Sequence, residues 1–366
     1  MPLLLTPGPL TTSAATRRAL LDDHGSRDPA FVAMVACVRR RLVELLEPGD
    51  TFTCVPIQGS GTFAVEAMIG TFVPREGALL VCVNGAYGDR IATMAARIGR
   101  RVVRLDHAET DPVNPERVAA ALAADATITH VAVVYCETTT GLLNPLDAVA
   151  AVVEAHGRRL LVDAMSAFGA LPMRGAAPID AVAASANKCL EGVPGLGFVL
   201  ARRAALAVTA GNAHSLSLDL YDQGKRLDAD GQFRFTPPTH VIAALAAALD
   251  QHAAEGGVAG RGARYRANLD VLVTGLEALG FAPLLPPGAR APIILTIRAP
   301  NHPRWSFPAF YDALVARGFA IYPGKLTVAD TFRVGCIGQV FPDDLRRFLA
   351  AVAEVAGAMG LSEESS

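Results

Sequence analysis

The chain has 366 residues, of which 51% are hydrophobic and 19% are charged, and its formal net charge is -2. This length allows a sizeable buried core and two domains, while the near-neutral charge excludes an electrostatic case for binding nucleic acid or an anionic membrane. The start, MPLLLTPGPL, lacks the basic region of a secretory signal, and the Ala-rich run 241–255 is too short to span a bilayer.

The six cysteines are widely scattered, and none forms a C-x-x-C pair: Cys37, Cys54, Cys82, Cys136, Cys189 and Cys336. Since no secretory signal precedes them, we expect free thiols that mostly fill the core of a cytoplasmic protein. We expect no metal site.

Short apolar runs alternate with helical patterns over the first 200 residues. Strands are predicted at 78–84, 100–105, 129–137, 158–164, 180–185 and 197–201, because these runs are rich in Val, Leu and Ile and show little polar alternation. Helices are predicted between them at 61–72, 89–99, 116–125 and 146–157. This alternation predicts an α/β fold with a mostly parallel central sheet and helices on both faces.

The pattern changes after about residue 255. Helices are predicted at 261–280, 307–318 and 342–360, with strands at 292–299 and 331–338. We therefore expect a large domain over 1–254 and a smaller C-terminal α+β domain over 255–366, joined near the Gly-rich stretch 255–262. The segment 1–20 is expected to pack toward the small domain and the active site.

Ligands of an open α/β sheet bind where parallel strands end, so the polar residues just past each strand are the candidates for a site. Ser60, Gly61 and Thr62 follow the apolar run TFTCVPI and begin a helix. Their backbone N–H groups and two hydroxyls suit an anion such as a phosphate. A plain helix N-cap is the alternative, since Ser and Thr favour that position.

Two charged residues follow neighbouring predicted strands. Asp163 ends the run RRLLVD, and Lys188 lies among the small residues of SANKCLEGVPG. A partly desolvated lysine can become a neutral nucleophile that forms Schiff bases, and a buried Asp needs a partner such as a protonated ring nitrogen. A structural cap or ion pair is the alternative for Asp163. The phosphate site, the Asp and the Lys together are the fixtures that pyridoxal phosphate requires.

Three further stretches fit this interpretation. Tyr87 of NGAYGDR could lie on the face of a pyridine ring or be a surface tyrosine. The hydroxyls of Thr138, Thr139 and Thr140 in CETTTGLLNP could reach the cofactor's phenolic oxygen or the substrate, or simply form a polar loop. Arg333, within the apolar run TFRVGCIG, is either exposed at a sheet edge or a bidentate clamp for an anion.

These blocks, in this order, resemble the class V aminotransferase family of fold-type I pyridoxal phosphate enzymes. The resemblance rests on LLLTPGPLTTS, QGSGTF, NGAYG, CETTTGLLNP, VDAMSAFGA, SANKCLEGVPGLGFVLA, RFTPPTH and FRVGCIG, and it covers nearly the full chain. The motifs ETTTG and SANKC are similar to those of the branch that acts on phosphonates. The resemblance implies amino transfer from 2-aminoethylphosphonate to pyruvate, in a homodimer with active sites at the subunit interface.

The resemblance also implies a role for each site residue. Lys188 links covalently to the cofactor, and Asp163 pairs with the ring nitrogen. The remaining cofactor-binding residues are Ser60, Gly61, Thr62, Tyr87, Thr138 and Thr236, of which Thr236 reaches the phosphate of the other subunit. The substrate-binding residues are Arg333, Thr139, Gly8 and Arg27.

One stretch departs from the phosphonate pattern. Arg27 precedes Asp28 where an aromatic residue before Asp is expected, and the wording is nearer to alanine–glyoxylate relatives. Arg27 would be a second cation for a phosphonate, or a structural ion pair with Asp22, Asp23 or Asp28. Two alternative functions stay open: an alanine–glyoxylate or serine–pyruvate type aminotransferase, and a non-catalytic protein that binds a phosphorylated metabolite.

Overall fold

The computed structural model describes residues 1–324, 326 and 329–361. Its centre is a seven-stranded sheet of order β2-β10-β9-β8-β5-β3-β4, in which β10 alone runs antiparallel to its two neighbours. The mostly parallel α/β sheet predicted from the alternating pattern is confirmed. The strands are β2 (Phe52–Gln58), β3 (Ala78–Val83), β4 (Arg101–Asp106), β5 (Ile128–Val134), β8 (Arg159–Asp163), β9 (Ile179–Ser185) and β10 (Leu196–Arg202).

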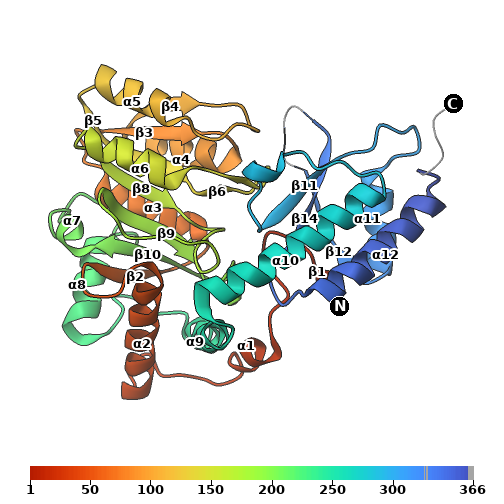
Figure 1. Cartoon of the computed structure of the whole chain (residues 1–366). Helices are drawn as coiled ribbons and strands as arrows, with labels where there is room; N and C mark the ends of the chain where they lie inside the picture. The colour runs from red at the N-terminus through yellow and green to blue at the C-terminus, as the bar shows by residue number, and fades with distance from the viewer. Residues whose placement is uncertain (325, 327–328, 362–366) are drawn as a thin grey trace.

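Helices cover both faces of this sheet, as expected for strands buried on both sides. Helices α3 and α4 pack on each other, as do α5 and α6, and Figure 1 shows these two pairs on opposite faces of the sheet. Their bounds are α3 (Gly61–Phe72), α4 (Ala86–Arg97), α5 (Pro115–Ala124) and α6 (Leu146–Ala155). The remaining helices of this part are α1 (Ala14–Arg18), α2 (Pro29–Leu46), α7 (Arg203–Ala207), α8 (Leu220–Asp230) and α9 (Thr239–Ala254).

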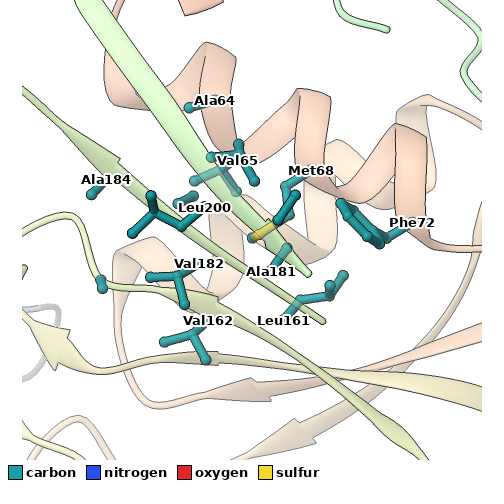
Figure 2. Close-up of a cluster of buried hydrophobic side chains, with 14 of the residues drawn as sticks. Ala64, Val65, Met68, Phe72, Leu161, Val162, Ala181, Val182, Ala184 and Leu200 are labelled. Carbon is teal, nitrogen blue, oxygen red and sulfur yellow. The ribbon is translucent and has the colours of Figure 1, made fainter. Parts of the chain in front are cut away.

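The core lies between the helices and the sheet. Helix α3 turns Val65, Met68 and Phe72 toward the strands, where they meet side chains such as Val182 and Leu200 (Figure 2). All of these side chains are almost fully buried. Burying each large apolar side chain contributes about 1.5–3 kcal/mol. This packing fixes the start of α3 against the sheet edge where β2 ends.

A second apolar cluster contains Leu5 and residues between 269 and 356. It packs around the antiparallel sheet β11-β14-β13, formed by β11 (Ile294–Arg298), β14 (Thr331–Gly335) and β13 (Tyr322–Pro323). The helices around this sheet are α10 (Gly257–Ala278), α11 (Phe307–Ala316) and α12 (Pro342–Ala358), and a short 3-10 turn spans Pro287–Ala289. The domain boundary at 254 and 255 stays a prediction.

The N-terminal segment joins this second part. Strand β1 (Leu3–Leu4) pairs in parallel with β12 (Phe319–Ala320), and Gly335 N donates to the Leu5 carbonyl. Figure 1 places the N-terminus beside α12. The first residues therefore pack on the C-terminal part of the chain. Among the described residues, no helix is long and apolar enough to cross a membrane.

Candidate active site

The sheet brings three predicted site segments to one edge. Strand β8 ends at Asp163, and the parallel strand β9 ends three residues before Lys188. Strand β2 runs in the same direction, and Ser60 follows its end. Since parallel strands deliver their carboxyl ends to the same edge, these segments lie at one edge of the sheet, where ligands of such sheets bind.

Asp163 is a buried carboxylate with one hydrogen bond: Oδ1 accepts from Met165 N at 2.9 Å. The pKa of Asp163 is raised from 3.8 to about 6, chiefly by burial and in smaller part by the nearby Glu137 carboxylate. The Met165 hydrogen bond and the cations Arg90 and Lys188 act in the opposite direction. A carboxylate in this state lacks a close cationic partner, and a protonated ring nitrogen would supply one.

Lys188 is half-buried, and its amine reaches the N-terminal segment. Nζ donates to the Pro7 carbonyl at 2.5 Å. A Cβ atom added to Gly8 would come within 2.6 Å of Lys188 Nζ, so the absence of a side chain at Gly8 makes room for the amine. The structure thus brings Gly8, predicted to bind substrate, against the predicted nucleophile.

The start of α3 has the features of an anion site. Ser60 is the N-cap residue, but its hydroxyl makes no capping hydrogen bond, so the plain N-cap alternative does not account for it. Gly61 lies so close to the Met165 side chain that a Cβ atom would clash with it. Arg90, which the sequence interpretation missed, donates to the Thr62 hydroxyl at 3.4 Å and covers the Tyr87 ring at 4.9 Å.

Glu137 organises the loop beside Tyr87. Its Oε1 accepts from the backbone N and hydroxyl of Thr139 at 2.9 and 2.6 Å, and its Oε2 accepts from Tyr87 N and Gly88 N at 3.1 and 3.4 Å. The carboxylate therefore lies at the N-terminus of α4, where negative charge is favoured. Burial nevertheless raises the pKa of Glu137.

The three threonines of this loop, Thr138, Thr139 and Thr140, are all buried, and their hydroxyl groups differ in their hydrogen bonding. The Thr139 side chain is fully buried, and its hydroxyl donates to Glu137 and accepts from Ala86 N at 3.0 Å. The Thr140 hydroxyl is buried without a hydrogen bond. Thr138 is also buried, and its carbonyl accepts from Arg333. Both hydrogen bonds of the Thr139 hydroxyl therefore stabilise the loop.

Arg333 lies on β14, the central strand of its sheet, with 1% of its surface exposed, which excludes the edge-exposed alternative. Its Nε donates to the Pro323 carbonyl at 3.0 Å and its Nη1 to the Thr138 carbonyl at 2.9 Å. Arg333 forms no ion pair with any described residue, and burial lowers its pKa. A buried guanidinium held only by carbonyls can accept an anionic ligand.

Arg27 and Thr236 lie together, in a pocket whose lining residues do not include Lys188. Both are exposed and line one pocket that also contains Arg226 and Arg234. Within the described part of the chain Arg27 forms no ion pair, so the alternative of a structural pair with Asp22, Asp23 or Asp28 has no support in this structure. Asp23 instead contacts His240 at 3.0 Å. Thr236 also lines a neighbouring pocket with Gly59 and Phe63.

The residues present fit pyridoxal phosphate. The chain offers a Ser60 hydroxyl without a capping hydrogen bond and a glycine at a helix N-terminus, a buried Asp163 with a single hydrogen bond from the described residues, and a lysine amine at the same sheet edge. Asp163 Oδ2 makes no hydrogen bond to a described residue. No group of three or more metal-binding side chains occurs among the described residues.

Comparison with known proteins agrees with this interpretation of the site. Residues 33–304 match the family Aminotransferase class-V. The chain is 54% identical over 362 residues to the 2-aminoethylphosphonate–pyruvate transaminase of Burkholderia ambifaria, covering 99% of this chain and 97% of that protein. It is 53% identical to the protein of the same name from Pseudomonas fluorescens, covering 97% of this chain and 96% of that protein.

Solved structures share the fold. The pyridoxamine–pyruvate aminotransferase of Mesorhizobium loti superposes with a TM-score of 0.90 at 26% identity, covering 98% of this chain and 93% of that one. The alanine–glyoxylate aminotransferase of Nostoc sp. also gives 0.90, at 25% identity, covering 97% of this chain and 95% of that one. The fold-type I architecture expected from the motifs is therefore confirmed.

Proposed function

Since the chain belongs to the class-V aminotransferase family, we propose that it transfers the amino group of 2-aminoethylphosphonate to pyruvate, giving phosphonoacetaldehyde and L-alanine. The observation that carries amino transfer is the placement of Asp163 and Lys188 at the ends of neighbouring parallel strands. The choice of substrates follows the relatives at 52–54% identity, which share this name over nearly their full length.

Pyridoxal phosphate is the cofactor of this proposal. Ser60, Thr62, Arg90 and the backbone N–H groups at the start of α3 would hold its phosphate, and Tyr87 would support its ring. When bound, the cofactor supplies an electron sink for the negative charge left on carbon after proton removal. Asp163, a buried carboxylate with a single hydrogen bond from the described residues, would keep the proton on the ring nitrogen.

Lys188 is both the attachment point and the proton carrier. In the neutral form its amine is a nucleophile, and it can take the proton from the carbon that bears the substrate's amino group. The Pro7 carbonyl accepts a hydrogen bond from Nζ at 2.5 Å and so restrains the position of the amine. The same amine would transfer the proton in both half-reactions, and the direction of transfer in the second would be the reverse of that in the first.

Arg333 binds the acidic group of each substrate in turn, because it is a buried guanidinium without an ionic partner. Thr139 is then a support for the Glu137 loop. We further propose a homodimer in which Thr236 and Arg27 of one subunit complete the cleft of the other. Their shared pocket supports this arrangement.

The alternative of an alanine–glyoxylate type enzyme is supported by Arg27 and by the fold of the Nostoc protein, but that protein is 25% identical. Half-reactions separate the two. We expect 2-aminoethylphosphonate to change the visible absorbance of the purified, cofactor-loaded protein much faster than serine does. A faster response to serine would overturn the choice of substrate.

Lys188→Ala tests the chemistry itself. Loss of the attachment point and of the proton carrier should reduce transamination by several orders of magnitude. Retention of a tenth of the wild-type rate would overturn the assignment. A purified protein that binds no pyridoxal phosphate would favour the non-catalytic binder of a phosphorylated metabolite.

A further inference from the structure

The backbone one residue after Lys188, at the Cys189 carbonyl, is held by a buried arginine from another part of the chain. Arg261, on α10, has no exposed surface, and its Nη1 donates to the Cys189 carbonyl at 2.6 Å. Arg261 Nη2 is buried without a hydrogen bond. A guanidinium that leaves a buried donor unused is a poor choice for stability alone. The hydrogen bond from Arg261 to the Cys189 carbonyl instead indicates that this arginine fixes the loop that carries Lys188.

Glu191 closes the same loop. Its backbone N donates to the Lys188 carbonyl at 2.8 Å, and its φ of 59° makes it the one non-glycine residue with positive φ in the described part of the chain. Such a conformation persists only where surrounding contacts impose it, and it clusters at functional sites. The loop carrying Lys188 is therefore fixed by its surroundings.

The side chain of Glu191 supplies those contacts. It accepts from Arg264 Nη2 and Tyr265 Oη, each at 2.6 Å, and from Gln339 Nε2 at 2.5 Å, and it lies 3.4 Å from Arg261 Nη1. Glu255 completes the cluster, contacting Arg261 Nε at 2.6 Å and Arg264 Nε at 2.7 Å. Two carboxylates thus balance two arginines, and removing one partner leaves an uncompensated buried charge.

The cluster also reaches the strand of Arg333. Arg264 Nη1 donates to the carbonyls of Gly338 and Val340, at 2.5 and 2.9 Å. These residues follow β14, which carries Arg333. One buried network therefore spans from the peptide next to Lys188 to the segment next to Arg333.

We propose that Arg261 and Glu191 are positioning residues, which fix the direction of the Lys188 side chain relative to Arg333. The proposal rests on the proposed function for the chemistry of Lys188. Neither residue touches the reacting atoms, and both act through the backbone of residues 188–191. Misplacement of a reacting group by about 1 Å can cost about a hundredfold in rate.

The test compares Arg261→Met with Arg100→Met. Arg100 is also a buried arginine that donates to carbonyls, of Gly70 and Asn212, and leaves its Nε without a hydrogen bond, but it lies away from the loop of Lys188. Pyridoxal phosphate is added to each cofactor-free protein, and borohydride then traps it on Lys188, as measured by peptide mass. Thermal unfolding, kcat and KM for pyruvate are measured on the same samples.

We expect Arg261→Met to slow trapping and lower kcat by about tenfold or more, with KM for pyruvate unchanged. Arg100→Met should lower the unfolding temperature and leave trapping unchanged. Wild-type trapping in folded Arg261→Met, or equal losses in both variants, would overturn the proposal. If Arg261→Met does not fold, Glu191→Gly keeps the positive φ and removes the carboxylate. Trapping at the wild-type rate in that variant would overturn the proposal as well.

Trapping requires only the cofactor and no substrate. It therefore tests the positioning role of Arg261 and Glu191 separately from the proposed substrate. A wild-type protein that traps pyridoxal phosphate on Lys188 but does not respond to 2-aminoethylphosphonate would overturn the proposed substrate and leave the positioning inference standing. A wild-type protein that traps nothing would overturn the proposed function itself.

Discussion

Gly8 packs directly against the side chain of Lys188. A Cβ atom at residue 8 would lie 2.6 Å from Lys188 Nζ and 3.0 Å from its Cδ. The φ of Gly8 is +120°, which L residues rarely adopt. A larger residue at this position would strain the backbone and require the Lys188 side chain to shift. The carbonyl of the preceding Pro7 is what the amine contacts.

Gly8→Ala should displace the Lys188 amine and lower kcat by about tenfold to a hundredfold. Gly49→Ala is the matched control, since Gly49 has a φ of +116° and no atom within 4 Å of an added Cβ. Both variants carry similar backbone strain, but only the first has the clash. Steady-state kinetics and thermal unfolding on both proteins check this, and equal kcat values would contradict it.

The buried Asp163 predicts a pH dependence of stability in the cofactor-free protein. Because the folded-state pKa is raised from 3.8 to about 6, the folded protein holds this proton more tightly than the unfolded chain does. The resulting stabilisation is fully present below about pH 4 and is lost as the pH rises through about 6, which amounts to about 3 kcal/mol. Asp163→Asn should flatten this part of the curve.

Chemical denaturation at several pH values between 4 and 8 measures that difference. In the cofactor-loaded enzyme the same variant should slow proton abstraction in the half-reaction with the amino donor, because the negative partner of the ring nitrogen is lost. A variant curve parallel to the wild type would show that Asp163 titrates normally. Unchanged proton abstraction would reduce Asp163 to a structural residue.

Glu137→Gln should destabilise the protein and disturb the position of Tyr87. The carboxylate accepts from four donors, and an amide would turn an NH2 group toward two of them. Each buried group left without a partner costs about 1–3 kcal/mol. Glu277→Gln, at an exposed position of α10, is the control. Urea denaturation and cofactor affinity measure the effect, and an affinity equal to that of the control would contradict it.

Arg333→Lys should raise KM for both 2-aminoethylphosphonate and pyruvate, because a lysine cannot reproduce the guanidinium fork. Loss of one hydrogen bond between charged groups, about 1.5–3 kcal/mol, corresponds to about tenfold to a hundredfold. Arg298→Lys, at the exposed end of β11 in the same sheet, should leave both KM values unchanged. A change in kcat alone would argue against binding by Arg333.

Arg27→Ala should impair the half-reaction with 2-aminoethylphosphonate and spare the one with alanine, because a phosphonate carries more negative charge than a carboxylate. The expected loss is about tenfold to a hundredfold for one charge-assisted hydrogen bond. Arg97→Ala, on the exposed side of α4, is the control. Single-turnover absorbance measures each half-reaction, and equal damage to both would remove Arg27 from phosphonate binding.

The sequence predicts the central sheet well, because strands buried on both faces appear as unbroken apolar runs such as 78–84. The same logic finds Asp163 and Lys188, since a charged residue directly after such a run is conspicuous. Helix α2 (Pro29–Leu46) lay outside the predicted elements, although Phe31, Val35, Val38 and Leu42 repeat at helical spacing. That period of apolar residues was the available signal.

Other residues could not be assigned from the sequence, because their roles depend on contacts between distant segments. Glu137 stands next to the conspicuous threonines, yet only the fold shows it beneath the start of α4. Glu191 and Arg261 are 70 positions apart in the sequence (261 − 191), and they meet only because α10 packs beside the loop of Lys188. The position of Arg27 beside Thr236 likewise depends on folding.

The pairing of β1 with β12 sets the order in which the molecule can be completed during synthesis. Leu3 leaves the ribosome near the start, but its partner Phe319 is made 316 residues later (319 − 3). At roughly 5–20 residues per second this interval is about 15–60 s. The strands of the central sheet are all available by residue 202, whereas Pro7 gains its fixed position only with β12. A nascent chain can therefore form the sheet long before Lys188 acquires the carbonyl that orients it, and catalytic competence is reached last.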